Sequence, residues 1–277
     1  MNALAEKIEE IILQHSSRGM DRVRRHLKPG YCERAARLIL ENRGTVLIGT
    51  GFPVAGSFES DGPIGAIALY QVLSHLNYQP KFVCAPPLSK ILFKRFDTCE
   101  IPILTWDESK KIARQILKSL NPSLVVSVER PGITENGRYY NMHAEDISAF
   151  TAKYDLFFNY AACPTIAFGD GGNEIGMGNV YELLADMSII PSVTTCDELI
   201  ISTVSNWGVY GVIALMGHRL KKDLLNLIQT ETIAGDLLAN GSVDGVTSRR
   251  ELSEDGFSIN VGVTIIQQLR ETIFPTN

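Results

Sequence analysis

The sequence has few cysteines, and they form neither a disulfide framework nor a zinc site. There are five in 277 residues, and no two of them stand in a CxxC pair. Zinc ribbons and disulfide-stabilised domains both need paired, regularly spaced cysteines. We therefore expect free thiols in a reducing compartment, and a cytoplasmic location fits that expectation.

Signals for membranes and nucleic acids are also missing. No apolar run approaches the roughly 20 residues that span a bilayer, and we interpret the amphipathic start, MNALAEKIEEIILQ, as a helix rather than a targeting peptide. Lysine and arginine form no extended run, and the net charge is −5. We therefore expect neither a membrane nor a nucleic acid as a partner.

Several common catalytic motifs are absent too. The stretch Gly49-Thr50-Gly51 follows a predicted strand, but the next glycine is Gly56, so the spacing of a dinucleotide fingerprint fails. The sequence contains no P-loop, no GxSxG elbow and no HExxH pair. We expect neither NAD nor PLP as a cofactor, and the acidic side chains become the main candidates for chemistry.

Strand and helix patterns alternate along the chain with short connections. This alternation predicts an α/β protein, a three-layer Rossmann-like fold with a largely parallel sheet. We interpret residues 1–277 as one domain, with N-terminal helices in 1–43, a core in 44–220 and a helical C-terminal tail in 221–277. Predicted strands are 45–48, 81–85, 101–105, 123–128, 165–168 and 198–204, and predicted helices are 3–15, 30–42, 63–76, 86–95, 107–120, 146–161, 179–185 and 209–220.

Conspicuous polar side chains follow the carboxyl ends of these strands. In open parallel sheets, ligands bind beyond those ends, so we expect the polar residues to share one site. They are Glu59 and Asp61 after the first strand, Glu129 and Arg130 after the fourth, Asp170, Asn173 and Glu174 in the stretch TIAFGDGGNEIGMG, and Ser205, Asn206 and Trp207 after the last.

Four carboxylates are candidate ligands of one divalent metal: Asp61, Glu129, Asp170 and Glu174. Their oxygens favour Mn²⁺ or Mg²⁺ over Zn²⁺. Glu174, Glu129 and Asp170 are also candidate catalytic groups, because like-charged neighbours raise the pKa of a carboxylate and make it a better base. The alternative is that each carboxylate caps a helix or pairs with an arginine, as Asp61 before Pro63 could do.

Candidate substrate-binding residues lie in the same loops. Arg130 and Arg138 could hold carboxylates by bidentate hydrogen bonds, or could instead pair with Glu129 or Glu135. The amides of Gly171-Gly172 could also bind an anion. Further candidates are Asn141, His143, Asn173, Ser205, Asn206 and Trp207, with Tyr139 and Tyr140 as possible pocket walls or ordinary core aromatics.

Four blocks of sequence together resemble a known family. They are GTGFPVAGSFESDGPIGA, VERPGITENGRYYNMHAEDIS, FGDGGNEIGMGNV and VSNWGVYG, within a stretch from about residue 44 to Asp244. In this order they are similar to the C-terminal domain family of D-glutamate cyclase, long classed as a domain of unknown function. The resemblance implies conversion of D-glutamate to 5-oxo-D-proline with loss of water. Activity across the family is not uniform, and a divalent-metal phosphatase is also implied.

The sequence departs from the family pattern at three positions. Ser60 stands where the family usually has threonine, and Val209 stands where it has a second glycine after the Ser-Asn-Trp-Gly block. His143 replaces an arginine. If that arginine holds a substrate carboxylate, His143 alters the specificity.

The resemblance and the acidic residues together predict a D-glutamate cyclase-like hydro-lyase acting on a small acidic substrate. A metal would polarise the γ-carboxylate as a Lewis acid. Two alternatives remain open: a divalent-metal-dependent phosphatase that uses the same acidic cluster, and a non-catalytic protein that binds a small acid. Assembly into a homo-oligomer is possible.

Overall fold

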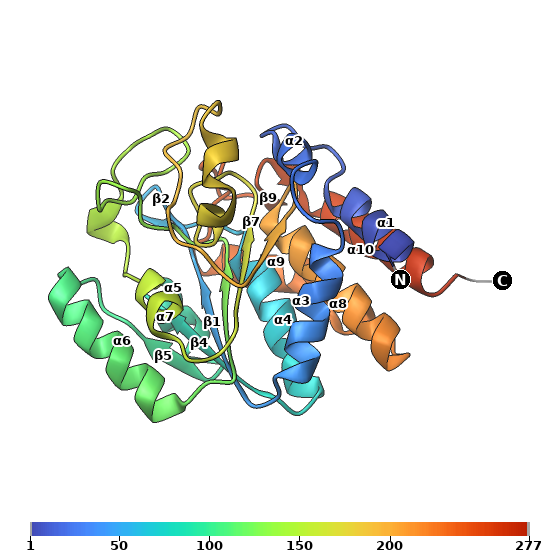
Figure 1. The fold of residues 1–277 in the computed structure, drawn as a ribbon, viewed down its shortest axis with the longest axis horizontal. Coiled ribbons are helices and arrows are strands. Elements are labelled where there is room, and N and C mark those ends of the chain that lie inside the picture. The colour runs from blue at the N-terminus through green and yellow to red at the C-terminus, as the bar shows by residue number, and fades with distance from the viewer. Residues whose placement is uncertain (1, 276–277) are drawn as a thin grey trace.

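A six-stranded parallel sheet forms the centre of the structure, a computed structural model that describes residues 2–275 (Figure 1). The strands are rich in Val, Ile, Leu and Phe and are buried almost throughout, as strands covered on both faces must be. The prediction of an α/β fold with a largely parallel sheet is confirmed. In spatial order the strands are β5 (Thr98–Glu100), β4 (Gln79–Cys84), β1 (Thr45–Thr50), β6 (Leu124–Val128), β7 (Thr165–Gly169) and β8 (Glu198–Ile201).

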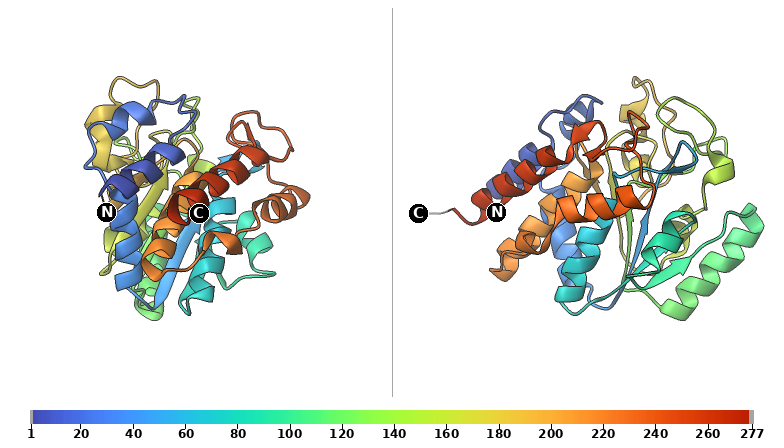
Figure 2. Two further views of the ribbon diagram at one scale, coloured as in Figure 1. Left: turned by 90° about the vertical axis from the view of Figure 1, so that its right-hand side faces the viewer. Right: turned by 180° about the vertical axis from the view of Figure 1, so that it is seen from behind.

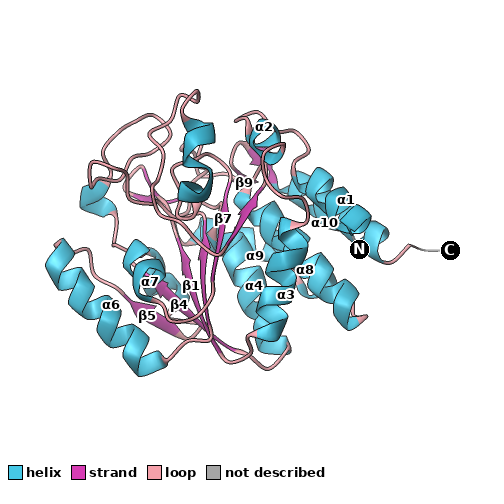
Figure 3. Cartoon of the chain, viewed as in Figure 1, coloured by secondary structure: helices cyan, strands magenta, loops and turns pink. Residues whose placement is uncertain are grey.

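The strand order places a crevice beside β1 and β6. From β1 the chain proceeds outward to β4 and β5, then returns to β6 and proceeds the other way to β7 and β8. Ligands bind at this kind of switch point in open α/β sheets. The register pairs Thr50 with Val128 and Val128 with Phe168, so these three strands end at the same level. The segments that follow them therefore meet, and loops gather beyond this end of the sheet (Figure 3).

Helices cover both faces of the sheet. Because β4 and β7 lie on opposite sides of the switch point, right-handed crossovers place α4 and α7 on opposite faces. On one face α4 packs against α8, which in turn contacts α3, and on the other face α6 packs against α7. The bounds are α3 (Tyr31–Glu41), α4 (Pro63–His75), α5 (Leu88–Leu92), α6 (Trp106–Leu120), α7 (Asp155–Tyr160) and α8 (Ser205–Leu220).

The two ends of the chain come together over α8. Helix α1 (Asn2–Ile12) lies beside α10 (Ile259–Ile273), and both contact α8 (Figure 2). With these two helices outside it, α8 is buried from its first residue to Gly217. Among residues 2–275, no helix combines the length and the hydropathy required to cross a membrane.

Short elements complete the chain around the crevice. Helix α2 (Met20–Arg24) follows α1, and the hairpin β2 (Pro53–Val54) and β3 (Ser57–Phe58) follows β1. The tail contains α9 (Thr230–Ala239). Before α10 it also contains a second hairpin, which β9 (Ser253–Glu254) and β10 (Phe257–Ser258) form. Three 3-10 helices are Ser148–Phe150, Met177–Leu184 and Leu225–Leu227.

Several predicted element boundaries were wrong. The strand predicted at 101–105 is β5 at 98–100, which pairs with Phe82–Cys84 before Pro102 interrupts the chain. The helix predicted at 146–161 shrinks to the six residues of α7. Its first half forms only the short 3-10 helix Ser148–Phe150 within a loop, because Asp146 accepts a bond from the Ser148 amide, while Asp155 accepts bonds from the Ile133 amide and the Thr194 hydroxyl. Helix α8 begins four residues before the predicted start at 209.

Candidate metal and substrate site

Three carboxylates meet where β1, β6 and β7 end. Asp61 comes from the loop between β3 and α4, Glu129 directly follows β6 and Asp170 directly follows β7. Each offers one oxygen atom, and these three atoms lie within 4.8 Å of one another. All three side chains are buried. We call this group the carboxylate triad.

The first turn of α8 holds the triad in place. The Ser205 amide donates to Asp61 Oδ2 (2.9 Å) and Asp170 Oδ2 (3.0 Å), and its hydroxyl donates to Glu129 Oε2 (2.6 Å). The Asn206 amide donates to Asp61 Oδ1 (2.9 Å). These amides belong to the positive end of the dipole of a 16-residue helix. The helix start therefore both orients the carboxylates and stabilises their negative charge.

Backbone geometry brings Asp61 and Glu129 close together. Glu129 has φ +43°, a left-handed conformation that is costly for a residue with a side chain. Gly62 has φ +86°, and a Cβ added there would lie 2.7 Å from the Glu129 Cβ. Only glycine fits this contact. Because position 62 has no side chain, the loops that carry Asp61 and Glu129 can approach each other closely.

Four further carboxylates surround the triad, and we call them the outer carboxylates: Glu59, Glu174, Glu254 and Asp255. All four are buried. Burial raises the pKa of Glu129 and Asp170 well above the usual range of carboxyl groups, and the neighbouring carboxylates raise it further for both. Burial likewise raises the pKa of Glu254 to about 8 and that of Asp255 to about 7. The site therefore favours bound protons or a bound cation at neutral pH.

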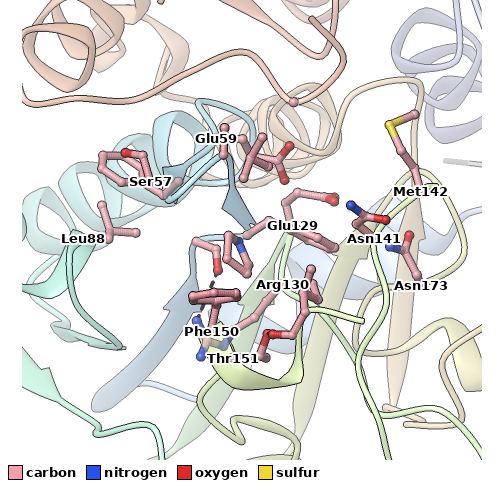
Figure 4. Close-up of a pocket in the computed structure, with 18 of the residues that line it drawn as sticks. Ser57, Glu59, Leu88, Glu129, Arg130, Asn141, Met142, Phe150, Thr151 and Asn173 are labelled. Carbon is pink, nitrogen blue, oxygen red and sulfur yellow. Dashed lines mark hydrogen bonds between the residues drawn. The ribbon is translucent and has the colours of Figure 1, made fainter. Parts of the chain in front are cut away.

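A cavity of about 450 Å³ opens onto this acidic region. Figure 4 shows Ser57 and Leu88 on one side of the opening, Asn141 and Asn173 on the other, and Glu129 between them. Glu59, Glu174 and Asp255 also line the cavity. Apolar side chains also line it, among them Phe52, Val54, Ile103, Ile147 and Phe150.

Glu174 serves its own loop rather than the triad. Its two oxygens accept hydrogen bonds from the Gly171 and Gly172 amides, at 2.9 and 2.8 Å. These amides are therefore not free to bind a substrate anion, and that role predicted for the two glycines was wrong. Among the described residues, Glu174 is also outside the group of carboxylates that gathers within metal-ligand reach. Burial raises the pKa of Glu174, and its side chain lines the cavity wall.

The two predicted arginines are engaged elsewhere. Arg130 lines the cavity, but its guanidinium donates to the carbonyl oxygens of Thr50 (2.9 Å), Gly51 (3.3 Å) and Ala152 (2.9 Å). It thus ties the end of β1 to the loop before α7. Arg138 is exposed, pairs with Asp146 at 2.6 Å and lies outside the cavity wall, so the structure contradicts a place for it in the pocket.

Besides Glu129, Arg130 and Glu174, three further residues of the predicted set line the cavity: Asn141, His143 and Asn173. The Asn141 side chain closes its own turn by accepting from the His143 amide at 3.0 Å. The Asn173 amide group donates to the Tyr140 carbonyl at 2.9 Å. His143 is exposed and also contributes to the cavity wall.

The residues at the start of α8 support the site from behind. Trp207 is fully buried in the core and packs on Phe257, so the prediction that it lines the pocket was wrong. Its indole N–H donates to Glu254 Oε1 at 2.7 Å. Asn206 donates to Glu254 Oε2 and accepts from the amides of Gly62 and Gly65. Ser205, Asn206 and Trp207 therefore position the acidic groups and do not line the cavity.

Sequence reasoning missed three contributors to the site: Arg18, Glu254 and Asp255. Arg18 forms ion pairs with Asp170 (2.7 Å) and Asp255. Burial opposes its charge, yet these two carboxylates together with Glu129 and Glu174 more than offset that effect and raise the pKa of the guanidinium. The motif Ser253-Glu254-Asp255-Gly256 near the β9–β10 turn was a usable signal, but nothing in the sequence around Arg18 indicates its role.

The triad suits a divalent cation. Asp170 Oδ1 is buried and has no hydrogen-bond donor, because the Arg18 contact is an ion pair without hydrogen-bond geometry. A buried carboxylate oxygen needs a positive partner, which is Arg18 in this structure and whose place a metal ion could take. Carboxylate oxygens are the ligands that Mn²⁺ and Mg²⁺ prefer. Asp61, Glu129 and Asp170 would hold such an ion.

The fold and the buried acidic crevice define an α/β protein with a candidate ligand site at the switch point of its sheet. The sequence model of the family described as "D-glutamate cyclase-like, C-terminal" matches residues 8–270. The chain belongs to this family. It is also 32% identical over 204 residues to the human protein named "D-glutamate cyclase, mitochondrial". The alignment covers 64% of this chain and 33% of the human protein, so the chain corresponds to about a third of that relative.

Proposed function

We propose that the protein is a divalent-metal-dependent hydro-lyase that converts D-glutamate to 5-oxo-D-proline and water. The observation that supports this best is the carboxylate triad, which lies at the switch point and includes a buried Asp170 oxygen without a hydrogen-bond donor. Family membership supports the reaction type. The cavity volume of about 450 Å³ easily accommodates a molecule of this size.

In this proposal Glu129 acts as the general base. The reaction joins the α-amino nitrogen to the γ-carboxyl carbon. The ammonium nitrogen loses two protons as it becomes the amide, and two protons leave with one γ-oxygen as water, so the ammonium must first lose a proton. Glu129 lines the cavity, and burial together with the charge of Asp170 raises the pKa of its carboxyl group, which makes the carboxylate a stronger base. The Ser205 hydroxyl holds its Oε2 atom at 2.6 Å and so fixes the carboxylate. When bound, the metal supplies a Lewis acid for the γ-carboxylate.

Asp170→Asn tests this function. Metal-free protein should lose D-glutamate cyclisation, and Mn²⁺ should restore it in the wild type. The amide removes the charge that faces the cation site, so the variant should show less than about 1% of the wild-type rate and no thermal shift with Mn²⁺. Substrate loss and product formation are followed by chromatography, with L-glutamate tested in parallel.

Glu198→Gln is the matched control. Glu198 is a largely buried carboxylate that binds Arg34 at the other end of the sheet, where β8 begins. This variant should keep both the activity and the response to Mn²⁺. If the wild type leaves D-glutamate untouched and hydrolyses a phosphomonoester instead, the site is that of a metal-dependent phosphatase. If it consumes neither substrate but binds D-glutamate, the protein is a binding protein.

A further inference from the structure

Arg18 lines the cavity but does not belong to the loops that follow the strand ends. It lies between α1 and α2, and its side chain is 25% exposed. Among residues 2–275, Arg18 and Arg130 are the arginines that line the cavity; both Nη atoms of Arg130 donate to backbone carbonyl oxygens, and its buried Nε has no hydrogen-bond partner. Arg18 is therefore the arginine whose partners are acidic side chains of the site itself.

The cavity is electrostatically unsuited to an acidic substrate unless a cation faces it. Glu59, Glu129, Glu174 and Asp255 line its wall, and D-glutamate brings two more carboxylates. A substrate carboxylate in this region must therefore contact a positive group. A guanidinium is the group best matched to a carboxylate, because two of its N–H groups can bind the two carboxylate oxygens at once.

Arg18 and a divalent cation would compete for the same oxygen atom. Arg18 Nη2 lies 2.7 Å from Asp170 Oδ1, the buried atom without a hydrogen-bond donor. A cation on the triad would neutralise Asp170 and repel the guanidinium. The second ion pair, to Asp255, would keep the side chain at the cavity wall.

We propose that Arg18 is the substrate-binding residue for a carboxylate of the acidic ligand, and that a divalent cation on the carboxylate triad releases it from Asp170 for this role. The inference rests on the proposed function, and it adds an order of events: the cation binds first and thereby creates the anion site. Arg18 takes the role that the sequence analysis gave to Arg130 and Arg138. The Nη atoms of Arg130 bind backbone carbonyl oxygens, and Arg138 pairs with Asp146 outside the cavity.

Arg18→Ala and Arg18→Lys test the proposal in two titrations. Calorimetry of metal-free protein with Mn²⁺ should show about tenfold tighter binding in Arg18→Ala, because a competing positive charge is gone. Mn²⁺-loaded protein is then titrated with glutarate, a dicarboxylate that has the carbon chain of glutamate but no amine and cannot cyclise. Glutarate affinity should fall at least tenfold in Arg18→Ala, and by less in Arg18→Lys, which keeps the charge but loses bidentate geometry.

Arg34→Ala is the matched control. Arg34 is 28% exposed and pairs with Glu198 away from the cavity, so both affinities should stay at the wild-type value. Opposite changes for Mn²⁺ and glutarate are the signature of the proposal. Weaker or unchanged Mn²⁺ binding in Arg18→Ala, or unchanged glutarate binding, would overturn it. If the wild type does not consume D-glutamate yet binds glutarate through Arg18, the proposed reaction fails and the anion site stands.

Discussion

Replacing Glu254 by glutamine should remove part of the pH dependence of folding stability in the metal-free protein. Glu254 is fully buried, and its oxygens accept hydrogen bonds from the Trp207 indole and the Asn206 side chain. Burial raises its pKa from 4.5 to about 8. The folded state therefore binds this proton more tightly than the unfolded chain does.

The direction and size of the effect follow from this shift. A group with a raised folded-state pKa contributes its full stability below its unfolded pKa, here 4.5, and loses it as the pH rises through about 8. The loss for Glu254 amounts to roughly 5 kcal/mol, or about 1.4 kcal/mol per pH unit inside that window. Asp255, with a pKa raised to about 7, adds to the same slope in the wild type.

The glutamine in Glu254→Gln cannot ionise, which removes the contribution of this residue to the pH dependence, but the variant also loses one hydrogen bond. Its single carbonyl oxygen can accept from only one of the two donors, which costs about 1–3 kcal/mol at every pH. The variant should therefore be less stable than the wild type at pH 5 and equal to it or more stable near pH 8.5. Urea unfolding in the presence of EDTA, followed by circular dichroism at several pH values, measures both curves.

A surface variant provides the comparison. Asp223→Asn breaks a partly exposed ion pair with Arg270 near the far end of α8, and it should keep the wild-type slope. If metal-free wild type became more stable from pH 5 to 8, or if Glu254→Gln kept the full slope, the reasoning from a buried proton would be refuted.

Two further substitutions test the packing around the triad. Gly62→Ala should cost about 2–4 kcal/mol in urea unfolding, because the new methyl group would meet Glu129 at 2.7 Å and the residue keeps a positive φ. Gly56→Ala is its control, since it shares the positive φ but faces open space, and a similar loss there would disprove the clash. Trp207→Phe keeps an aromatic ring in the core and removes the donor to Glu254, so it should cost about 1–3 kcal/mol, and unchanged stability would show that this bond contributes nothing.

Much of the site followed from the order of elements along the chain. Asp61, Glu129 and Asp170 each follow a strand pattern, and parallel strands end at one edge of a sheet. That reasoning located the triad without coordinates. It could not separate Glu174 from the triad, because a side chain five residues after a strand end can turn back to the amides of its own loop, as this one does.

Other errors arose where tertiary contacts override local pattern. Residues 146–154 have the composition of a helix, but Asp146 and Asp155 are used to bind loop amides, and the helix is reduced to α7. Trp207 next to polar residues suggested a pocket wall. Its ring instead fills the core behind the site, because α10 near Gly262 and Phe257 of the β9–β10 hairpin cover it.

The sequence by itself determined the α/β class, the parallel sheet and the edge at which the acidic residues gather. The hydrophobic periodicity and the order of strands and helices along the chain are properties of the sequence and can be read from it directly. It also carried the family resemblance. Only the tertiary structure decided which charges meet: Arg18, Glu254 and Asp255 join the site from both ends of the chain. Such contacts depend on how α1 and α10 pack across α8, and no local pattern records that packing.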